Sequence, residues 1–116
     1  MFKEPPKEAL GRIPRLYCTE GQPPEEKIIH GRFFLGAYDW YVAEFDGEDL
    51  FFGFVNLNDP DMAEWGYFTL SELRQLSGTL RLVDAVTGKS VARGAVFVEW
   101  DEHWQPWPFR DVAWWT

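Results

Sequence analysis

The chain has 116 residues, of which 46% are hydrophobic, and this length and composition fit one globular domain rather than a disordered chain. Its net charge of −8 disfavours a general nucleic-acid binder, and a single cysteine, Cys18, excludes an internal disulfide framework. No apolar run reaches transmembrane length and the first residues show no signal-peptide pattern, so we expect a cytoplasmic protein without membrane contact.

Residues 1–26 predict a short helix followed by an extended segment. Pro6 suits the first turn of a helix over residues 7–12, and Gly11 and Pro14 end it. Runs of β-branched and aromatic residues then predict three strands, over residues 28–35, 38–46 and 50–57. Gly53 inside the third strand predicts a bulge or a close approach by another element.

The second half of the chain predicts one helix, a hairpin and a tail. Residues 66–68 are extended, and Thr69 with Glu72 forms a capping box for a helix that ends near Leu76, with its leucines (Leu70, Leu73 and Leu76) on one face. Two more strands are expected over residues 80–86 and 91–99, and the tail is expected to be irregular and packed on the sheet.

The predicted fold is therefore a single compact α+β domain with a mainly antiparallel, twisted sheet of about five strands and one or two short helices. Within 1–116 we distinguish an N-terminal part over residues 1–26, a sheet with one helix over 27–100 and a Trp-rich tail over 101–116.

Acidic residues dominate the middle of the sequence. From Phe33 to Leu73 there is no Lys or Arg, whereas nine positions are Asp or Glu. Such a field can attract a basic partner, although carboxylates at loop ends also keep an aromatic-rich protein soluble. The acids that we expect to bind a partner are Glu48, Asp49, Asp59, Asp61 and Glu64.

Aromatic residues are the second unusual feature, because 21 of the 116 residues are Phe, Trp or Tyr. Exposed tryptophans can anchor a protein interface, stack on single-stranded bases, or cover one face of a sheet. The net charge favours a protein partner over nucleic acid. The aromatic anchors that we expect are Trp65, Trp104, Trp107, Trp114 and Trp115.

Candidates for catalysis and metal binding are weak. The sequence Asp46-Gly47-Glu48-Asp49 offers oxygen ligands but fits a plain hairpin turn better. Glu44 alternates in step with Trp40 and Val42, so we expect it on the same face of the strand. There it could act as a general acid or base, or form an ion pair with Arg32. His30 and His103 lack metal-ligand spacing, and we predict no catalytic residue, metal or cofactor.

Two blocks of sequence resemble a known family. The run from Trp40 to Gly53 is similar to the signature block of domain of unknown function 2958, and Glu64 to Leu73 resembles its second block. Residues 13–17 and 99–106 are also similar, so the likeness spans most of the chain. The chain differs from this family in its length between Gly78 and Gly94, and it has Trp65 where the family usually has Leu. The resemblance implies a small protein of plasmids, integrative elements or phages, and no assigned chemistry.

These observations favour a non-enzymatic acidic protein-binding module from a mobile genetic element. We expect it, as a monomer or homodimer, to inhibit a host nucleic-acid-handling defence enzyme by acting as a decoy, with the partner's identity left open. One alternative is a single-stranded nucleic-acid accessory factor, which would need a basic groove from Arg12, Arg15, Arg32, Arg74 and Arg81. Another is a metal-dependent hydrolase built on Glu44.

Overall fold

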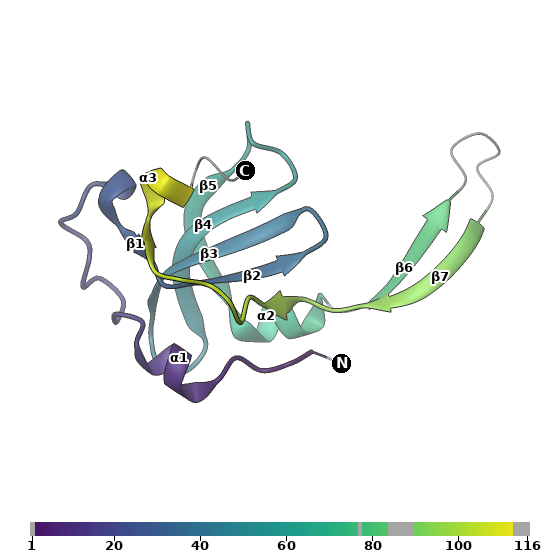
Figure 1. Ribbon diagram of the computed structural model, residues 1–116, viewed down its shortest axis with the longest axis horizontal. Coiled ribbons are helices and arrows are strands. Elements are labelled where there is room, and N and C mark those ends of the chain that lie inside the picture. Colours follow the sequence, from purple (N-terminus) through teal and green to yellow (C-terminus); the bar gives the residue numbers. More distant parts are fainter. Residues whose placement is uncertain (1, 77, 84–89, 113–116) are drawn as a thin grey trace.

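A five-stranded antiparallel sheet lies at the centre of the protein (Figure 1). The computed structural model describes residues 2–76, 78–83 and 90–112, with side chains described outside residues 77–96. The strand order is β5-β4-β3-β2-β8. The strands are β2 (Gly31–Leu35), β3 (Tyr38–Phe45), β4 (Leu50–Leu57), β5 (Glu64–Thr69) and β8 (Glu99–Trp100).

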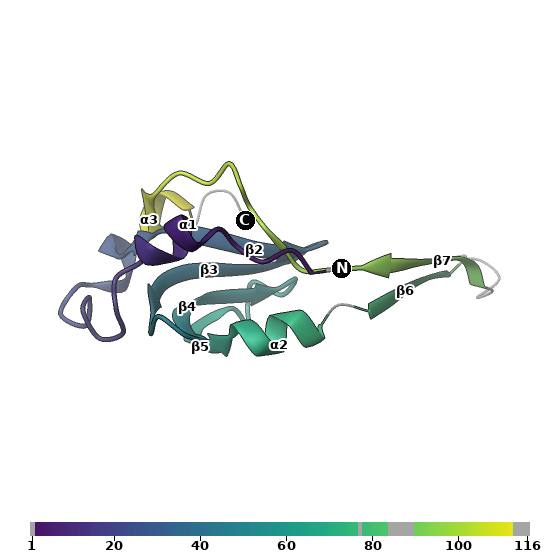
Figure 2. The same ribbon diagram turned by 90° about the horizontal axis from the view of Figure 1, so that it is seen from below.

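The other elements flank this sheet or project from it. They are α1 (Lys7–Gly11), the 3-10 helix η1 (Pro24–Glu26), β1 (Ile28–Ile29), α2 (Leu70–Gln75), β6 (Gly78–Val83), β7 (Ser90–Val96), β9 (Trp107–Pro108) and α3 (Phe109–Val112). β1 pairs with β9, and β6 pairs with β7 in a separate hairpin that extends away from the sheet (Figures 1 and 2). The predicted α+β class is confirmed. In the described part of the chain, no helix is long and apolar enough to span a membrane.

The two faces of the sheet are covered to different extents. On one face, which we call the core face, Phe33, Trp40 and Phe51 pack against Leu70 and Leu73 of α2. On the opposite face, which we call the open face, a smaller cluster joins the sheet to β1 and α3; its buried members are Ile29, Tyr41, Ala43 and Val112. Figure 2 shows α2 and α3 on opposite sides of the sheet. The open face is therefore where side chains remain accessible.

A bulge in β3 changes which residues point to each face. The pairing with β4 shifts between Val42 and Glu44, so that Glu44 lies opposite Phe52. The shift coincides with Gly53, where an added Cβ would lie 1.7 Å from the carbonyl oxygen of Tyr41. The predicted bulge or close approach at Gly53 is confirmed. The prediction that Glu44 shares a face with Val42 is wrong, because the extra residue of the bulge rotates Glu44 to the open face.

Other local predictions were met in part. The Thr69 hydroxyl accepts a hydrogen bond from the backbone N–H of Glu72 at 3.0 Å, as the capping box predicts. Leu76 is 49% exposed, because α2 ends at Gln75 before Leu76 can pack beside Leu70 and Leu73. The strand predicted over 28–35 is divided at His30.

The C-terminal half differs more from expectation. In the tail, residues 101–106 are irregular and Trp104 packs on the sheet, as predicted, whereas residues 107–112 form β9 and α3, and Phe109 packs against Phe54 with ring centroids 4.7 Å apart. The strands predicted over 80–86 and 91–99 correspond to β6 and β7, and the segment predicted to join them lies outside the described residues.

Candidate functional site

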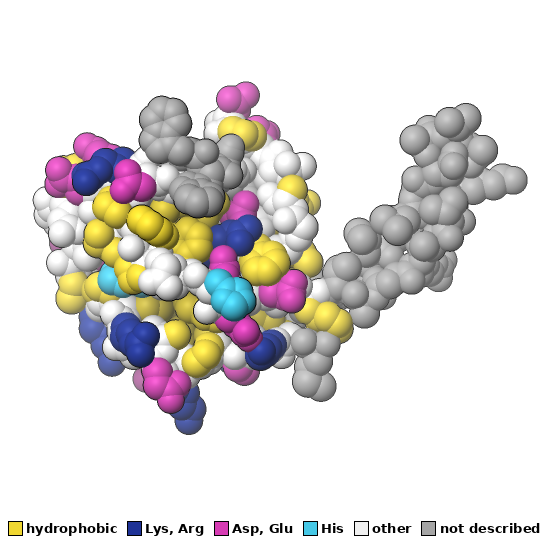
Figure 3. Space-filling view, viewed as in Figure 1, with side chains coloured by type: hydrophobic (Ala, Val, Ile, Leu, Met, Phe, Trp, Pro, Cys, Tyr) yellow, Lys and Arg dark blue, Asp and Glu magenta, His cyan; other side chains and the backbone are white. Residues whose placement is uncertain are grey.

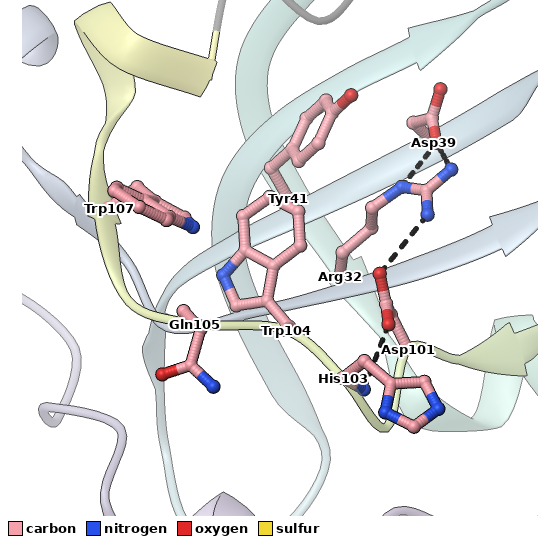
Figure 4. Close-up of a pocket in the computed structure, with 8 residues that line it drawn as sticks. All are labelled: Arg32, Asp39, Tyr41, Asp101, His103, Trp104, Gln105 and Trp107. Atoms are coloured by element: carbon pink, nitrogen blue, oxygen red, sulfur yellow. Dashed lines mark hydrogen bonds and ion pairs between the residues drawn. The ribbon is translucent and has the colours of Figure 1, made fainter.

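A cavity of about 420 Å³ opens on the open face (Figure 4). Strands β2 and β3 form its base, and the segment from β8 to β9 crosses over it. Its lining residues are Arg32, Asp39, Tyr41, Asp101, His103, Trp104, Gln105 and Trp107. Charged groups thus lie on one side and aromatic rings on the other.

The charged side is organised around one arginine. Asp39 Oδ1 accepts from Arg32 Nε at 2.7 Å and lies 2.6 Å from Nη2, and Arg32 Nη1 donates to Asp101 Oδ2 at 3.3 Å. Asp101 Oδ1 also accepts from the backbone N–H of His103 at 3.0 Å. Because two carboxylates share one guanidinium, this side of the cavity has a net negative charge.

The aromatic side is held by packing and by one hydrogen bond. The rings of Tyr41 and Trp104 have centroids 5.9 Å apart, and Trp104 Nε1 donates to the carbonyl oxygen of Ile29 at 2.9 Å. Trp107 is 44% exposed, so part of its ring faces solvent. Figure 3 shows hydrophobic side chains gathered over this part of the molecule, with acidic and basic side chains around them. The cavity can therefore present aromatic faces to a ligand.

The electrostatics of the cavity act on Tyr41. Burial, reinforced by the negative charge of Asp39, raises the pKa of Tyr41 to about 12, although Arg32 opposes this shift. The phenol therefore stays protonated at neutral pH and can only serve as a hydrogen-bond donor or acceptor. Such a tyrosine suits ligand binding better than proton transfer.

The five acids predicted to form one surface lie in two separate groups. Glu48 and Asp49 belong to the turn before β4, whereas Asp59, Asp61 and Glu64 follow β4. An eight-residue strand separates the groups by roughly 26 Å at 3.3 Å a residue. Two of these acids have structural contacts: Asp49 Oδ1 accepts from the Ser71 backbone N–H at 2.9 Å, and Asp59 Oδ1 accepts from the Asp61 N–H at 3.1 Å.

The predicted tryptophan anchors also occupy different environments. Trp104 and Trp107 line the cavity, but Trp65 lies in β5 with its ring 4.8 Å from that of Phe109. Trp65 is therefore a packing residue of the open face. Trp114 and Trp115 lie outside the described residues.

The catalytic and metal candidates are not brought together. Glu44 does not pair with Arg32, which instead contacts Asp39 and Asp101. Asp46 Oδ1 accepts backbone N–H bonds from Glu48, Asp49 and Leu50 (2.7, 2.8 and 3.1 Å), and these bonds lower its pKa, as expected of a turn residue. Among the residues with described placement, no group of three His, Cys, Asp or Glu side chains could hold a metal ion.

Two arginines of the predicted basic groove, Arg32 and Arg74, form ion pairs within the protein. Arg74 Nε donates to Glu4 Oε1 at 2.6 Å, and Arg32 is held between carboxylates. Both guanidinium groups already have anionic partners, which disfavours their use for phosphate binding. The side chain of Arg81 lies outside the described residues.

Our sequence interpretation did not assign Asp39, Tyr41 or Asp101 to a binding site, and it placed Arg32 only in the basic groove of the nucleic-acid alternative. One signal was present, because Arg32 and Asp39 flank a short turn and share a face of the β2–β3 hairpin through the pairing of Arg32 with Tyr41. The contribution of Asp101 had no comparable signal, since it is 69 positions from Arg32.

Comparison of the chain with protein-family models, with curated proteins and with solved structures gave no match. The resemblance to domain of unknown function 2958 therefore stays a prediction.

Proposed function

We propose that the protein is a non-enzymatic binding module that accepts a basic side chain of a partner protein in the cavity of Figure 4. The observation that supports this most is the composition of the cavity. Aromatic rings of Tyr41, Trp104 and Trp107 lie beside a charge network in which acids outnumber bases. Aromatic faces next to carboxylates attract a guanidinium or ammonium group.

The net charge of the chain supports the same class of partner. At −8, the protein attracts basic surfaces at long range, and the cavity then gives one cationic side chain a specific place. Surfaces of this kind occur on proteins that handle nucleic acid, where rows of Lys and Arg contact phosphates. A decoy or inhibitor of such a protein is the biological role that we propose.

Fluorescence anisotropy with labelled peptides tests the proposal directly. An arginine- and lysine-containing peptide should bind, and a peptide of equal length with citrulline and acetyl-lysine should not. Trp107→Ala should weaken binding by about 5- to 30-fold, the effect of losing one partly desolvated cation–π contact. Tyr38→Ala is the matched control, because Tyr38 is 42% exposed but does not line the cavity.

A second variant separates charge from aromatic contact. Asp101→Asn keeps the shape of the side chain but removes the excess negative charge of the cavity, so binding should weaken and its salt sensitivity should fall, whereas Asp61→Asn should have a smaller effect on both. Equal binding of the charged and neutral peptides would contradict the proposal. Tighter binding of a labelled single-stranded oligonucleotide than of the basic peptide would favour the nucleic-acid accessory role instead.

A further inference from the structure

A second cavity, of about 320 Å³, lies on the open face at the other end of β3 from Asp39. Its walls come from the loop between α1 and η1, at the left of Figure 1, and from β3, β4 and β5. The lining residues are Tyr17, Glu20, Gln22, Pro24, Lys27, Glu44, Phe52 and Tyr67. None of them contributes to the cavity of Figure 4.

The deep end of this cavity contains a buried lysine. Lys27 is only 6% exposed, and its Nζ donates to the carbonyl oxygen and to Oγ1 of Thr19, the latter at 3.0 Å. An ammonium group has three N–H donors, so one donor has no acceptor among the described residues. No described carboxylate lies within ion-pair distance of Lys27. A buried ammonium in this state favours an anionic ligand atom.

Glu44 fixes the loop that forms the cavity wall. Its carboxylate, 3% exposed, accepts from the backbone N–H groups of Tyr17 at 2.8 Å and Thr19 at 3.1 Å, and from the Thr19 hydroxyl. Tyr17 has a φ of 70°, a strained value for a residue other than glycine. The three donors that bond to Glu44 all belong to this loop, and Thr19 does not line the cavity.

The outer end has the opposite charge. Glu20 is exposed at the rim, and the ring of Phe52 forms an apolar wall beside Tyr67, with ring centroids 5.1 Å apart. Desolvation, the neighbouring Tyr17 and the charge of Glu44 raise the pKa of Tyr67, so its phenol remains a donor at neutral pH. The cavity therefore has a buried cation, Lys27, and a buried carboxylate, Glu44, inside, a second carboxylate, Glu20, at the rim and an aromatic wall beside them.

We propose that this cavity binds a free α-amino acid with an apolar or aromatic side chain. Its carboxylate would accept from Lys27 and from the phenol of Tyr67, its ammonium group would contact Glu20, and its side chain would pack on Phe52. A ligand carrying both charges a short distance apart matches the cavity better than a simple anion, which Glu20 and Glu44 would repel.

Titration of the full-length ¹⁵N-labelled protein with L-phenylalanine tests this proposal. Amide shifts confined to residues 17–27 and 67 are expected, and both N-acetyl-phenylalanine and phenylalaninamide, each lacking one charge, should bind about tenfold more weakly. Glu20→Gln should abolish the discrimination against the N-acetyl compound. Glu25→Gln is the matched control, since Glu25 is exposed in η1 and does not line the cavity.

Lys27→Met addresses the buried end, and Tyr67→Phe provides a milder change there if the first variant does not fold. Either variant should weaken the binding of L-phenylalanine more than the binding of phenylalaninamide, which has no carboxylate. If none of the three compounds shifted the amide signals at 20 mM, the proposal would be overturned. Equal affinity for the zwitterion and its capped forms would overturn it as well.

Discussion

Replacement of Glu44 by alanine gives the sharpest test of the structure. The carboxylate accepts hydrogen bonds from two backbone N–H groups and one hydroxyl of the loop around Thr19, at an exposure of 3%. Glu44→Ala leaves these three donors without acceptors and removes the carboxylate that is joined to buried Lys27 through the Thr19 hydroxyl. The variant therefore combines three orphaned donors with the loss of the anion at the end of this hydrogen-bond chain.

The expected loss of stability follows from the number of hydrogen-bond donors that lose their acceptor. Each buried unsatisfied donor costs about 1–3 kcal/mol, and water reaches part of this loop, so we expect a total loss of about 3–5 kcal/mol in the free energy of unfolding. Glu44→Gln keeps one acceptor oxygen but places an amide N–H₂ against a donor. Its free energy of unfolding should therefore lie between those of the wild type and Glu44→Ala. Glu64→Ala, at an exposed position of β5, should change the free energy by less than about 0.5 kcal/mol.

Urea denaturation followed by circular dichroism measures these differences, and amide hydrogen exchange locates them. Exchange should accelerate first at Tyr17 and Thr19, whose N–H groups bond to Glu44. A loss below about 1 kcal/mol for Glu44→Ala, or unchanged exchange at these two amides, would refute the assignment of Glu44 as the group that fixes the loop.

Three further predictions concern the fold. Gly53→Ala should lower the free energy of unfolding by about 3 kcal/mol in urea titrations, because the new Cβ would lie 1.7 Å from the backbone oxygen of Tyr41; wild-type stability would show that the close approach does not exist. Thr69→Ala should cost about 1 kcal/mol by removing the acceptor of the Glu72 N–H, measured by thermal unfolding. The pKa of Tyr41, raised to about 12, should appear in ultraviolet titration as a phenol that ionises last and is absent from Tyr41→Phe. Because the unfolded phenol ionises near pH 10, stability is retained below that pH and falls as pH rises towards 12.

The β-meander could be predicted from the sequence because its signals are local. Asp46 and Gly47 predict the turn, and Gly47 has a φ of 92°, in the left-handed region that glycine tolerates. Runs of aromatic and β-branched residues predict β3 and β4 at nearly their observed bounds. The predicted length of β4 also separates Asp49 from Asp59 by eight extended residues, so the acids on either side of this strand cannot form one patch.

The sites could not be predicted because they depend on long-range geometry. A one-residue bulge reverses the face of every later residue in a strand, and alternation alone placed Glu44 beside Val42 rather than beside Phe52. The network around Arg32 needs β8 to pair with β2, through Phe33 and Trp100. No local pattern in the sequence indicates that pairing.

The unequal covering of the sheet explains why both cavities lie on the same face. The core face is closed by α2 and by Ile13, which follows α1, and its aromatic rings pack on one another, as Phe45 and Phe51 do at 4.4 Å. On the open face, the described residues that cover the centre come from the short elements β1, β9 and α3 and from Trp104 between β8 and β9. The cavity of Figure 4 and the cavity beside Lys27 lie towards opposite ends of β3, and each includes a buried or half-buried charged side chain, Arg32 or Lys27, beside aromatic rings.

Such an arrangement is costly for stability alone, because a second apolar layer over the open face would bury more surface without desolvating charges. It is the arrangement expected when a sheet presents preorganised polar groups to a ligand. The two proposals can fail independently, since the basic-peptide assay depends on Trp107 and Asp101, whereas the amino-acid titration depends on Lys27 and Glu20. A variant that abolishes one binding event and spares the other would show that the open face contains two separate sites.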